Sequence, residues 1–488
     1  MRDRPNFLII MSDQHHAGIM GCAGDGVIRT PHLDRIAARG VRFDRCYTPS
    51  PLCVPARMAF MTGQYPSDTG ARCNEDILGS DIPTFAHALS LAGYETALCG
   101  RMHFTGPDQR HGFEKRLVGD LTGVHHRLLR PEADQLMRDA VEAMNQSWHA
   151  ANFSGPGRSF ILDYDDEVTG AGVDFLDNRT DERPLCLVVG TFLPHCPFVI
   201  DEELFESYRD RVPAPHVPEG YFETVHPLIN QWIEDRGVTA IDPAITKRVR
   251  EAYYGMVTYF DRLVGRLLDA LERSGAADDT VVIYCSDHGE MAGEHGMFWK
   301  SNFFEGSVRV PLLASWPDRF ARGAVVDANV NLVDIGPTLI ELAGAPPLPL
   351  TRGRSLARFL SGEGVDDWAN ETFSEHYNTL NLPPGRMIRK DAWKLVHYHG
   401  HDTPMLFDVE RDPEELNDLG ADPDHAALRQ ELLARVLGDW DGGRVEGEVN
   451  RKRKEYAPYL AQWGEATQLE HPEYWQGRNE MNRFTPPA

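Results

Sequence analysis

The stretch "NFLIIMSDQHH", residues 6–16, places an apolar run directly before an aspartate and a glutamine. Three other stretches have the same plan, an apolar run followed at once by polar residues: "YETALCGRMHF" (94–104), "LCLVVGTFLPHCPF" (185–198) and "TVVIYCSDHGE" (280–290). Continuous β-branched and aliphatic runs separated by helical segments are typical of a parallel sheet covered on both faces. We therefore predict an α/β fold built on such a sheet.

Helical patterns fill the segments between these runs. Residues 30–40 begin with a threonine and end at a glycine, residues 81–94 form a second such segment, and residues 248–275 repeat apolar positions every three and four residues. The sequence thus supplies helices to cover the predicted sheet.

Polar side chains gather at the ends of the four predicted strands. In open α/β sheets, ligands bind beyond the carboxyl ends of the strands. If these strands are parallel neighbours, one edge of the sheet collects Asp13, Gln14, Arg101, His103, His195, Asp287 and His288. A single aspartate after a strand more often caps a helix, but four coincident strand ends favour a shared site. Its oxygen donors suit Ca²⁺, Mg²⁺ or Mn²⁺, and an imidazole also admits Zn²⁺.

The composition limits the classes of partner. The chain has 488 residues, 42% of them hydrophobic and 25% charged, which is typical of a soluble globular protein with two or three domains. Its formal net charge of -25 argues against nucleic acid or an anionic membrane as a partner. The N-terminal run "FLIIM" is too short for a secretory signal, and eight scattered cysteines fit a reducing compartment. We expect a cytoplasmic protein.

The segment "SPLCVPARMAF", residues 50–60, places Cys53 at a predicted helix start, with Gly63 as the stop. A helix N-terminus and Arg57 one turn later would favour a thiolate. No histidine–asparagine arrangement of the thiol-protease kind is evident nearby, and a thiolate is a poor companion for a hard cation. A plain core cysteine is the ordinary alternative.

The motif "CVPAR", followed by "MTGQYP", resembles the C-x-P-x-R signature of the type I, formylglycine-dependent sulfatases of the alkaline phosphatase superfamily. The similarity extends over nearly the whole chain, through "GEHGMFWKSNFFEGSVRVPLL" (293–313), "LVDIGPTLIELAG" (332–344) and "LFDVERDPEELNDLG" (406–420). The segment "GRMHFTGPDQRHGFE" (100–114) is most similar to choline sulfatase-like members. The resemblance implies an alkaline-phosphatase-like fold, with a large mixed sheet between helices and a smaller C-terminal α+β subdomain.

The resemblance also implies an activity, the hydrolysis of a small-molecule sulfate monoester to an alcohol and inorganic sulfate. A formylglycine-generating enzyme would convert Cys53 to formylglycine, whose hydrate is the nucleophile. One divalent cation, Ca²⁺ first and Mn²⁺ or Mg²⁺ as alternatives, would be bound by Asp13, Gln14, Asp287, His288 and modified Cys53.

The remaining site residues have roles that follow from the same resemblance. Arg57 would hold the formylglycine hydroxyl, His103 would contact the same residue and take a proton from its second hydroxyl, and His195 and Lys300 would bind the sulfate and assist the leaving oxygen. The family usually has a lysine where this chain has Arg101. Arginine keeps the charge but does not readily donate a proton, so we expect Arg101 to act electrostatically.

Three points stay open. Asn74 and Glu375 stand where choline sulfatase-like members have polar substrate contacts, yet residues 120–146 lack the tryptophan expected there, so choline, other alkyl and aryl sulfates are all retained. A phosphonate monoester or phosphodiester hydrolase would use the same site. A metal-stabilised binding protein with an unmodified Cys53 is the non-enzymatic alternative.

The chain is expected to divide into three parts: a catalytic domain over 1–365, a C-terminal subdomain over 366–450 with a short antiparallel sheet, and a tail over 451–488. The tail is rich in aromatic residues and has little periodicity. The resemblance implies that it covers a neighbouring subunit, so we expect a homo-oligomer, a dimer or a tetramer.

Overall fold

The computed structural model describes residues 4–121, 139, 141–239, 241–377, 381–456, 458–459, 462 and 483–484. Most of the segment 120–146 and most of the predicted tail, 451–488, lie outside the described residues. The sheet, its covering helices and the strand ends all lie within them.

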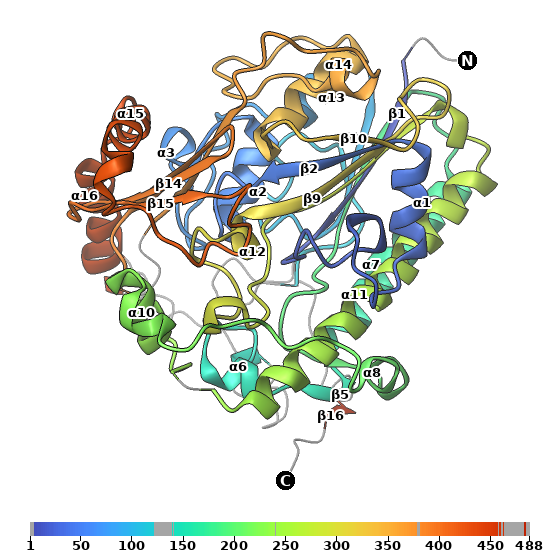
Figure 1. The fold of residues 1–488 in the computed structure, drawn as a ribbon. Helices are drawn as coiled ribbons and strands as arrows, with labels where there is room; N and C mark the ends of the chain where they lie inside the picture. Colours follow the sequence, from blue (N-terminus) through green and yellow to red (C-terminus); the bar gives the residue numbers. More distant parts are fainter. Residues whose placement is uncertain are drawn as a thin grey trace.

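A nine-stranded mixed sheet forms the centre of the molecule (Figure 1). The four predicted strands are consecutive parallel neighbours in it, in the order β8, β1, β6, β3. The prediction is therefore confirmed for these strands, while β9 runs antiparallel to both of its neighbours and makes the sheet mixed. In spatial order the strands are β10 (Ala324–Val326), β2 (Val41–Tyr47), β9 (Arg309–Ser315), β8 (Thr280–Ser286), β1 (Asn6–Ser12), β6 (Leu185–Gly190), β3 (Glu95–Gly100) and β4 (Lys115–Arg116), with β11 (Val330–Asn331) beside β2.

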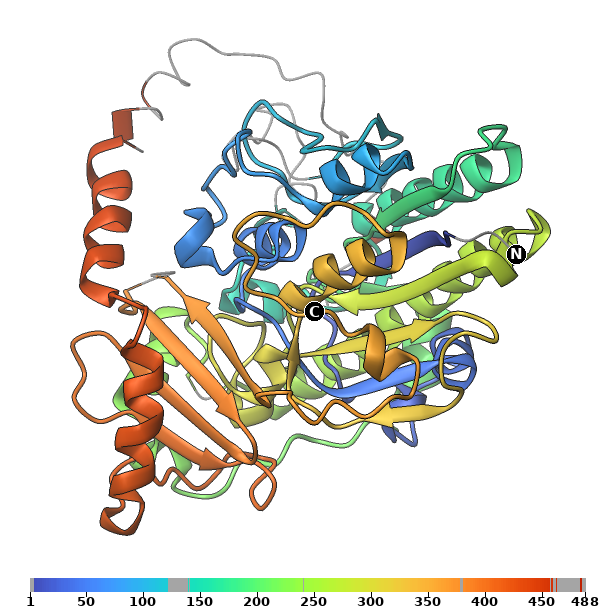
Figure 2. The same cartoon turned by 90° about the horizontal axis from the view of Figure 1, so that it is seen from above.

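Helices cover both faces of this sheet (Figures 1 and 2). Alternate side chains of β1 enter two separate hydrophobic clusters, Leu8 and Ile10 on one face and Phe7 and Ile9 on the other. Every residue of β1 and β8 is buried, which explains why these strands read as unbroken apolar runs. The first face packs against α1 (Pro31–Arg39), α7 (Phe160–Asn178) and α11 (Pro243–Arg273), and the second against α2 (Cys53–Thr62), α4 (Phe85–Leu91) and α13 (Ile335–Ala343).

The helices predicted from periodicity correspond to α1, α4 and α11. Helix α4 is shorter than its predicted span because Thr84 and His87 form a capping box that starts it at Phe85. Helix α11 begins earlier than predicted, at Pro243, behind the capping carboxylate of Asp242. Other described helices are α3 (Pro66–Thr69), α6 (Trp148–Asn152), α8 (Glu202–Tyr208), α9 (Tyr221–Thr224), α10 (Pro227–Asp235), α12 (Glu305–Val308) and α14 (Ala357–Leu360).

A separate antiparallel sheet follows in the C-terminal part of the chain. Its strands are β12 (Glu371–His376), β13 (Gly385–Lys390), β14 (Trp393–Tyr398) and β15 (Met405–Asp408). Helix α15 (Ala426–Leu437) packs on it through Leu432 and Val436. Helix α16 (Gly442–Arg451) contributes Val445 and Val449 to a separate apolar cluster. A small third sheet contains β5 (Gly155–Arg158), β7 (Val199–Ile200) and β16 (Arg483–Phe484). Among the described residues, none of the helices has the length and apolar character needed to cross a bilayer.

Candidate active site

The ends of β1 and β8 bring four predicted ligands together. The two strands are in parallel register, with Ser12 opposite Ser286, so the residues that follow them leave the sheet at the same level. Asp13, Gln14, Asp287 and His288 are all fully buried. The backbone N–H of Gln14 donates to Asp287 Oδ1 at 3.2 Å, which ties the two strand ends to each other. The predicted convergence at one edge of the sheet is therefore present for these residues.

Cys53 lies at the first position of α2 and faces these strand ends. Its Sγ is 3.2 Å from His288 Nε2 and 3.8 Å from Asp13 Oδ1, and its side chain is buried. Helix α2 ends at Gly63, whose φ of 68° is the left-handed conformation that glycine adopts at a helix C-terminus. The predicted helix around the cysteine motif has these bounds, and it places the thiol among carboxylate and imidazole groups.

Arg57, one turn into α2, bridges the two buried aspartates. Its Nε donates to Asp287 Oδ2 at 2.8 Å and its Nη2 donates to Asp13 Oδ2 at 3.1 Å. The planar guanidinium suits this paired recognition of carboxylates. Because Arg57 takes the Oδ2 atom of each aspartate, the Oδ1 atoms are left facing the imidazole of His288.

The arrangement around His288 fits a divalent cation. The imidazole Nε2 is 3.6 Å from Oδ1 of Asp13 and 3.6 Å from Oδ1 of Asp287. His288 Nδ1 is 3.1 Å from the carbonyl oxygen of Gly289, which can only accept, so Nδ1 carries the hydrogen and Nε2 presents a lone pair. Burial lowers the pKa of His288 and keeps the ring neutral.

Two carboxylate oxygens and an imidazole lone pair therefore point at one another. A cation between these acceptors would be attracted to all three. The donor atoms of Asp13, Cys53, Asp287 and His288 all lie within 4.8 Å of one another. The residues present thus form a suitable site for a metal ion with oxygen and nitrogen ligands.

Asp13 is held in its charged form. Burial alone would raise the pKa of its carboxyl group, but the positive charges of Arg101 and Arg57 hold that pKa well below its usual range. Arg101 Nε donates to Asp13 Oδ2 at 2.7 Å. A permanently ionised Asp13 is what a cation ligand requires.

Gln14 is oriented by two buried charged groups. Its Nε2 donates to Glu290 Oε2 at 2.5 Å, and its Oε1 accepts from Lys300 Nζ. The other oxygen of Glu290 accepts from the backbone N–H groups of Ala292 at 2.8 Å and Trp299 at 2.6 Å. Lys300 is buried beside the strand ends rather than solvated. Glu290 was not predicted as a site residue. Its position at the end of the segment "SDHGE", three residues after Asp287, could have indicated that it lies near the site.

Arg101 and His103, which follow β3, form a second buried group. Arg101 Nη1 donates to Asp120 Oδ1 at 3.1 Å, and Nη2 lies 2.8 Å from His103 Nδ1. The backbone N–H of His103 donates to Asp120 Oδ2 at 2.7 Å. The guanidinium also lies 4.2 Å from the ring centroid of Phe192. Asp120 and Phe192 were missed by the sequence analysis, and Asp120 had no motif to reveal it.

His195 follows β6 and completes the set of predicted imidazoles. Its Nδ1 donates to the carbonyl oxygen of Cys196 at 2.7 Å. Burial and the positive charge of Lys300 lower its pKa, so the ring is neutral near pH 7. The structure therefore gathers the predicted catalytic and metal residues at one edge of the sheet.

The two predicted substrate contacts have different surroundings. Asn74 Oδ1 accepts from the backbone N–H of Val54 at 3.0 Å, beside Cys53. Glu375 is buried, and its carboxylate accepts from Ser67 N at 2.9 Å and from the Tyr377 hydroxyl at 2.7 Å. These contacts satisfy Glu375 within the chain. A role in substrate binding remains a prediction for both residues.

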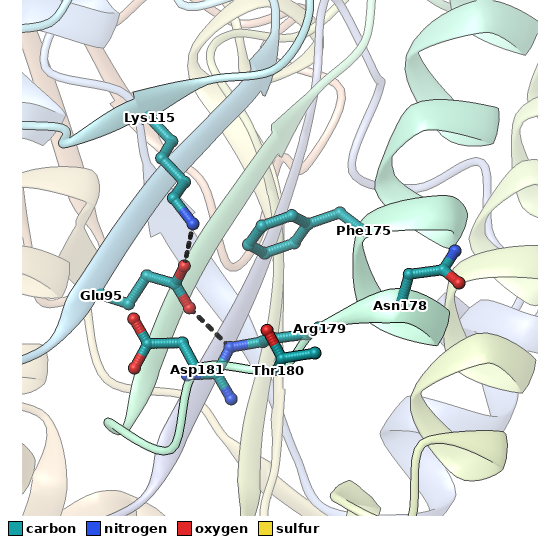
Figure 3. Close-up of a pocket in the computed structure, with 7 residues that line it drawn as sticks. All are labelled: Glu95, Lys115, Phe175, Asn178, Arg179, Thr180 and Asp181. Atoms are coloured by element: carbon teal, nitrogen blue, oxygen red, sulfur yellow. Dashed lines mark hydrogen bonds and ion pairs between the residues drawn. The ribbon is translucent and has the colours of Figure 1, made fainter.

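A cavity of about 410 Å³ lies at the opposite end of β3 (Figure 3). Glu95 begins that strand, and it pairs there with Lys115 and with Arg179 Nε at 2.6 Å, so the charges of the cavity compensate one another. This cavity contains none of the predicted site residues and lies a strand length from Arg101. Its lining consists of Glu95, Lys115, Phe175, Asn178, Arg179, Thr180 and Asp181.

Comparison with known proteins assigns the family. Residues 5–345 match the family model Sulfatase, and residues 293–439 match the model N-sulphoglucosamine sulphohydrolase, C-terminal. The chain is 37% identical over 444 residues to the choline-sulfatase of Rhizobium meliloti (strain 1021). This alignment covers 86% of this chain and 83% of that protein. It is 28% identical to an arylsulfatase of Clostridium perfringens (strain 13 / Type A), with 91% of this chain and 96% of the relative covered.

Among solved structures, the phosphonate monoester hydrolase of Agrobacterium radiobacter has a TM-score of 0.74 and 26% identity, covering 89% of this chain and 95% of that chain. Fold and site together define a hydrolase of the alkaline phosphatase superfamily. Within that class, the chain belongs to the sulfatase family and is a sulfuric ester hydrolase. The predicted fold class, family and enzyme class are confirmed.

Proposed function

We propose that this chain hydrolyses a sulfate monoester to an alcohol and inorganic sulfate through formylglycine made from Cys53. The observation that carries the proposal is the position of Cys53, with Sγ 3.2 Å from His288 Nε2 and 3.8 Å from Asp13 Oδ1. A residue at this position, once converted, presents oxygen atoms to the same centre as the two aspartates. An unmodified thiol would be a poor partner for that oxygen-rich centre.

The residues that would hold the cation are Asp13, Gln14, Asp287, His288 and modified Cys53. When bound, the cation and the hydrated aldehyde would supply Lewis acidity and a nucleophilic oxygen. Ca²⁺ is the first expectation because oxygen donors dominate the set, and Mn²⁺ or Mg²⁺ are the alternatives. Metal analysis of the purified protein, followed by chelation and restoration with each ion in turn, identifies which cation sustains activity.

The buried positive groups explain how an acidic chain accepts an anionic substrate. Arg57, Arg101 and Lys300 lie around the strand ends, although the whole chain has a formal net charge of -25. In a buried site these charges stabilise negative charge far better than they would in water. Lys300 and His195 would contact the sulfate, and Lys300 would give a proton to the leaving oxygen.

The test combines chemistry at residue 53 with activity. The full chain, co-expressed with a formylglycine-generating enzyme, should release sulfate from nitrophenyl sulfate. Mass spectrometry of the peptide around Cys53 should show the aldehyde, and the Cys53→Ala variant should be inactive. An active protein that contains only the intact thiol would contradict the proposed mechanism.

A second candidate function is the hydrolysis of phosphonate monoesters or phosphodiesters by the same residues. The structural similarity to a phosphonate monoester hydrolase, with a TM-score of 0.74 and 26% identity, favours testing it. Comparing kcat/KM on nitrophenyl sulfate and on a phenylphosphonate ester separates the two functions. We expect the sulfate ester to be preferred.

The ester, the assembly and the location are the finer parts of the proposal. The similarity to a choline-sulfatase makes choline sulfate the first ester to test, beside other alkyl and aryl sulfates. We propose a cytoplasmic homo-oligomer, a dimer or tetramer, in which the tail 451–488 covers a neighbouring subunit. Light scattering of the full chain and of a chain truncated after residue 450 tests this arrangement, and a monomer in both cases would refute it.

A further inference from the structure

Helix α7 carries a buried carboxylate in its interior. Asp165 is fully buried, and its neighbours Tyr164 and Val168 belong to the hydrophobic cluster on this face of the sheet. It lies beyond the first turn of α7, so it does not cap that helix. A carboxylate in such surroundings costs free energy of desolvation unless hydrogen-bond donors compensate it.

The donors to Asp165 are two consecutive backbone N–H groups of the segment that follows β6. The N–H of Phe192 donates to Asp165 Oδ1 at 2.8 Å and to Oδ2 at 3.0 Å, and the N–H of Leu193 donates to Oδ2 at 2.7 Å. Both carboxylate oxygens are therefore used. An asparagine has the same shape but can accept hydrogen bonds at only one of these two atoms.

The segment held by Asp165 touches two groups of the candidate active site. The carbonyl oxygen of Leu193 accepts from the backbone N–H of Asp13 at 3.2 Å. The ring centroid of Phe192 lies 4.2 Å from the guanidinium carbon of Arg101. Arg101 Nε in turn donates to Asp13 Oδ2 at 2.7 Å. The backbone and the carboxylate of Asp13 thus both depend on where this segment lies.

We propose that Asp165 is a positioning residue, which fixes Phe192 and Leu193 so that Asp13 and Arg101 keep their places at the candidate metal centre. This inference rests on the proposed function in one respect, that Asp13 is a ligand of the cation. Because both oxygens of Asp165 face the segment after β6, the residue acts through that backbone and not by contact with the substrate. A residue that only satisfied two buried N–H groups would affect stability alone.

Asp261 of α11 provides a matched control. It is a buried carboxylate inside a helix, and it also accepts from two consecutive backbone N–H groups, those of His32 at 3.1 Å and Leu33 at 2.8 Å. His32 and Leu33 belong to the first turn of α1 and not to a strand end at the site. Asp165→Asn and Asp261→Asn therefore remove the same kind of contact from two different segments.

The first test is calorimetric titration of chelator-treated full chain with Ca²⁺ alone. We expect Asp165→Asn to weaken Ca²⁺ binding by about 10–100-fold, the range typical of groups behind a metal ligand. We expect Asp261→Asn to leave the affinity at the wild-type value, although both variants should unfold at lower urea concentration than wild type. Equal Ca²⁺ affinity in the two folded variants would overturn the proposal.

Hydrogen exchange measured by mass spectrometry tests the same inference without a cation. In metal-free Asp165→Asn, exchange should be faster than in wild type in the peptides that contain residues 191–195 and Asp13. In Asp261→Asn it should be faster only in the peptide at the start of α1. Unchanged exchange around Asp13 in Asp165→Asn would overturn the proposal.

If Asp165→Asn does not fold, the wild-type chain decides the question. Coupling between two sites is reciprocal, so Ca²⁺ bound at Asp13 should slow exchange over residues 191–195 and leave exchange at His32 and Leu33 unchanged. The absence of this slowing would overturn the proposal. These measurements need neither turnover nor a converted Cys53, so their failure is distinct from an absence of sulfate release.

Discussion

At the scale of single residues, Arg57 is a buried charge that pairs with two carboxylates of the site. It is fully buried and its guanidinium joins two fully buried carboxylates, from two different strand ends. Removing one partner of a buried ion pair leaves the other charges uncompensated. The site therefore depends on Arg57 for charge balance as well as for any contact with substrate.

For Arg57 we predict different losses in two variants. Arg57→Met removes the charge and should lower the free energy of unfolding by about 3–5 kcal/mol. Arg57→Lys keeps the charge but does not bridge Asp13 and Asp287, so it should unfold less readily than Arg57→Met and still lose about 10²–10³-fold in kcat/KM. Urea unfolding and sulfate-release kinetics measure the two effects. Equal stability of wild type and Arg57→Met would contradict the account.

Glu290 orients the side chain of Gln14, which we propose as a ligand of the cation. Its oxygen accepts from Gln14 Nε2 at 2.5 Å, which turns Gln14 Oε1 toward Lys300. Glu290→Gln has the same shape but places an N–H₂ group near Gln14. The amide of Gln14 can then flip, so that its oxygen and nitrogen exchange places. Substitutions behind a metal ligand typically cost about 10–100-fold in affinity.

We predict this loss of Ca²⁺ affinity for Glu290→Gln, measured by calorimetric titration of chelator-treated protein. Glu294→Gln is the matched control, because Glu294 belongs to the same loop and pairs with His16 instead. Equal Ca²⁺ affinity in both variants would show that Glu290 does not orient Gln14.

At the scale of elements, the ends of β3 and β6 are packed so closely that only glycine fits at the end of β6. The backbone N–H of Arg101 donates to Gly190 O at 2.8 Å, and a Cβ atom on Gly190 would lie 1.7 Å from the carbonyl oxygen of Arg101. The absence of a side chain at this position therefore determines where the residues after β3 lie.

Gly190→Ala should push Arg101 away from Asp13. We expect a loss of about 1–3 kcal/mol in the free energy of unfolding, as for other overpacked positions, together with reduced kcat/KM. Gly26→Ala is the control, because a Cβ atom there meets nothing within 4 Å. Denaturant unfolding and sulfate-release kinetics of both variants measure these two losses. Unchanged activity in Gly190→Ala would show that the packing of Gly190 against Arg101 does not position Arg101.

At the scale of the whole molecule, a buried charge cluster joins the large sheet to the C-terminal sheet. Lys394 of β14 is fully buried between Glu305 of α12, at 2.9 Å, and Glu415, at 2.5 Å. The backbone N–H of Glu305 also donates to Glu415 Oε2 at 2.6 Å. Burial raises the pKa of Glu415 to about 7, whereas Lys394 and Arg309 outweigh burial at Glu305 and lower its pKa to about 2.

This cluster should make stability depend on pH. The folded state holds the Glu415 proton more tightly than the unfolded state, whose pKa is about 4.3. The stabilisation from Glu415 is therefore complete below that value and is lost as pH rises toward 7. Glu415→Gln does not ionise and should lack this loss.

Urea unfolding of wild type and Glu415→Gln across pH 4.5–7.5 tests the expectation. The stability of wild type relative to the variant should fall across this range and level off above about pH 7. Parallel pH profiles would contradict it. Glu410→Gln is the control, since Glu410 is an exposed partner of Arg45 in the same segment.

Much of the site could be predicted because its signals are local in the sequence. Asp13 and Asp287 directly follow buried strands, and Cys53 and Arg57 belong to one short helical motif. Apolar periodicity likewise identified the four parallel strands and the long helix α11. These features depend only on neighbouring residues.

Tertiary structure alone decided the features that depend on distant partners. Glu290 meets Gln14 across 276 positions, Asp120 has no motif of its own, and β9 enters the sheet antiparallel between β8 and β2. The contacts of the His103 and His195 rings also depend on their neighbours in space and on no sequence pattern. The sequence by itself thus determined which groups reach the edge of the sheet. Strand register and buried hydrogen bonds decided how those groups are oriented, because orientation is set by contacts between segments far apart in the chain.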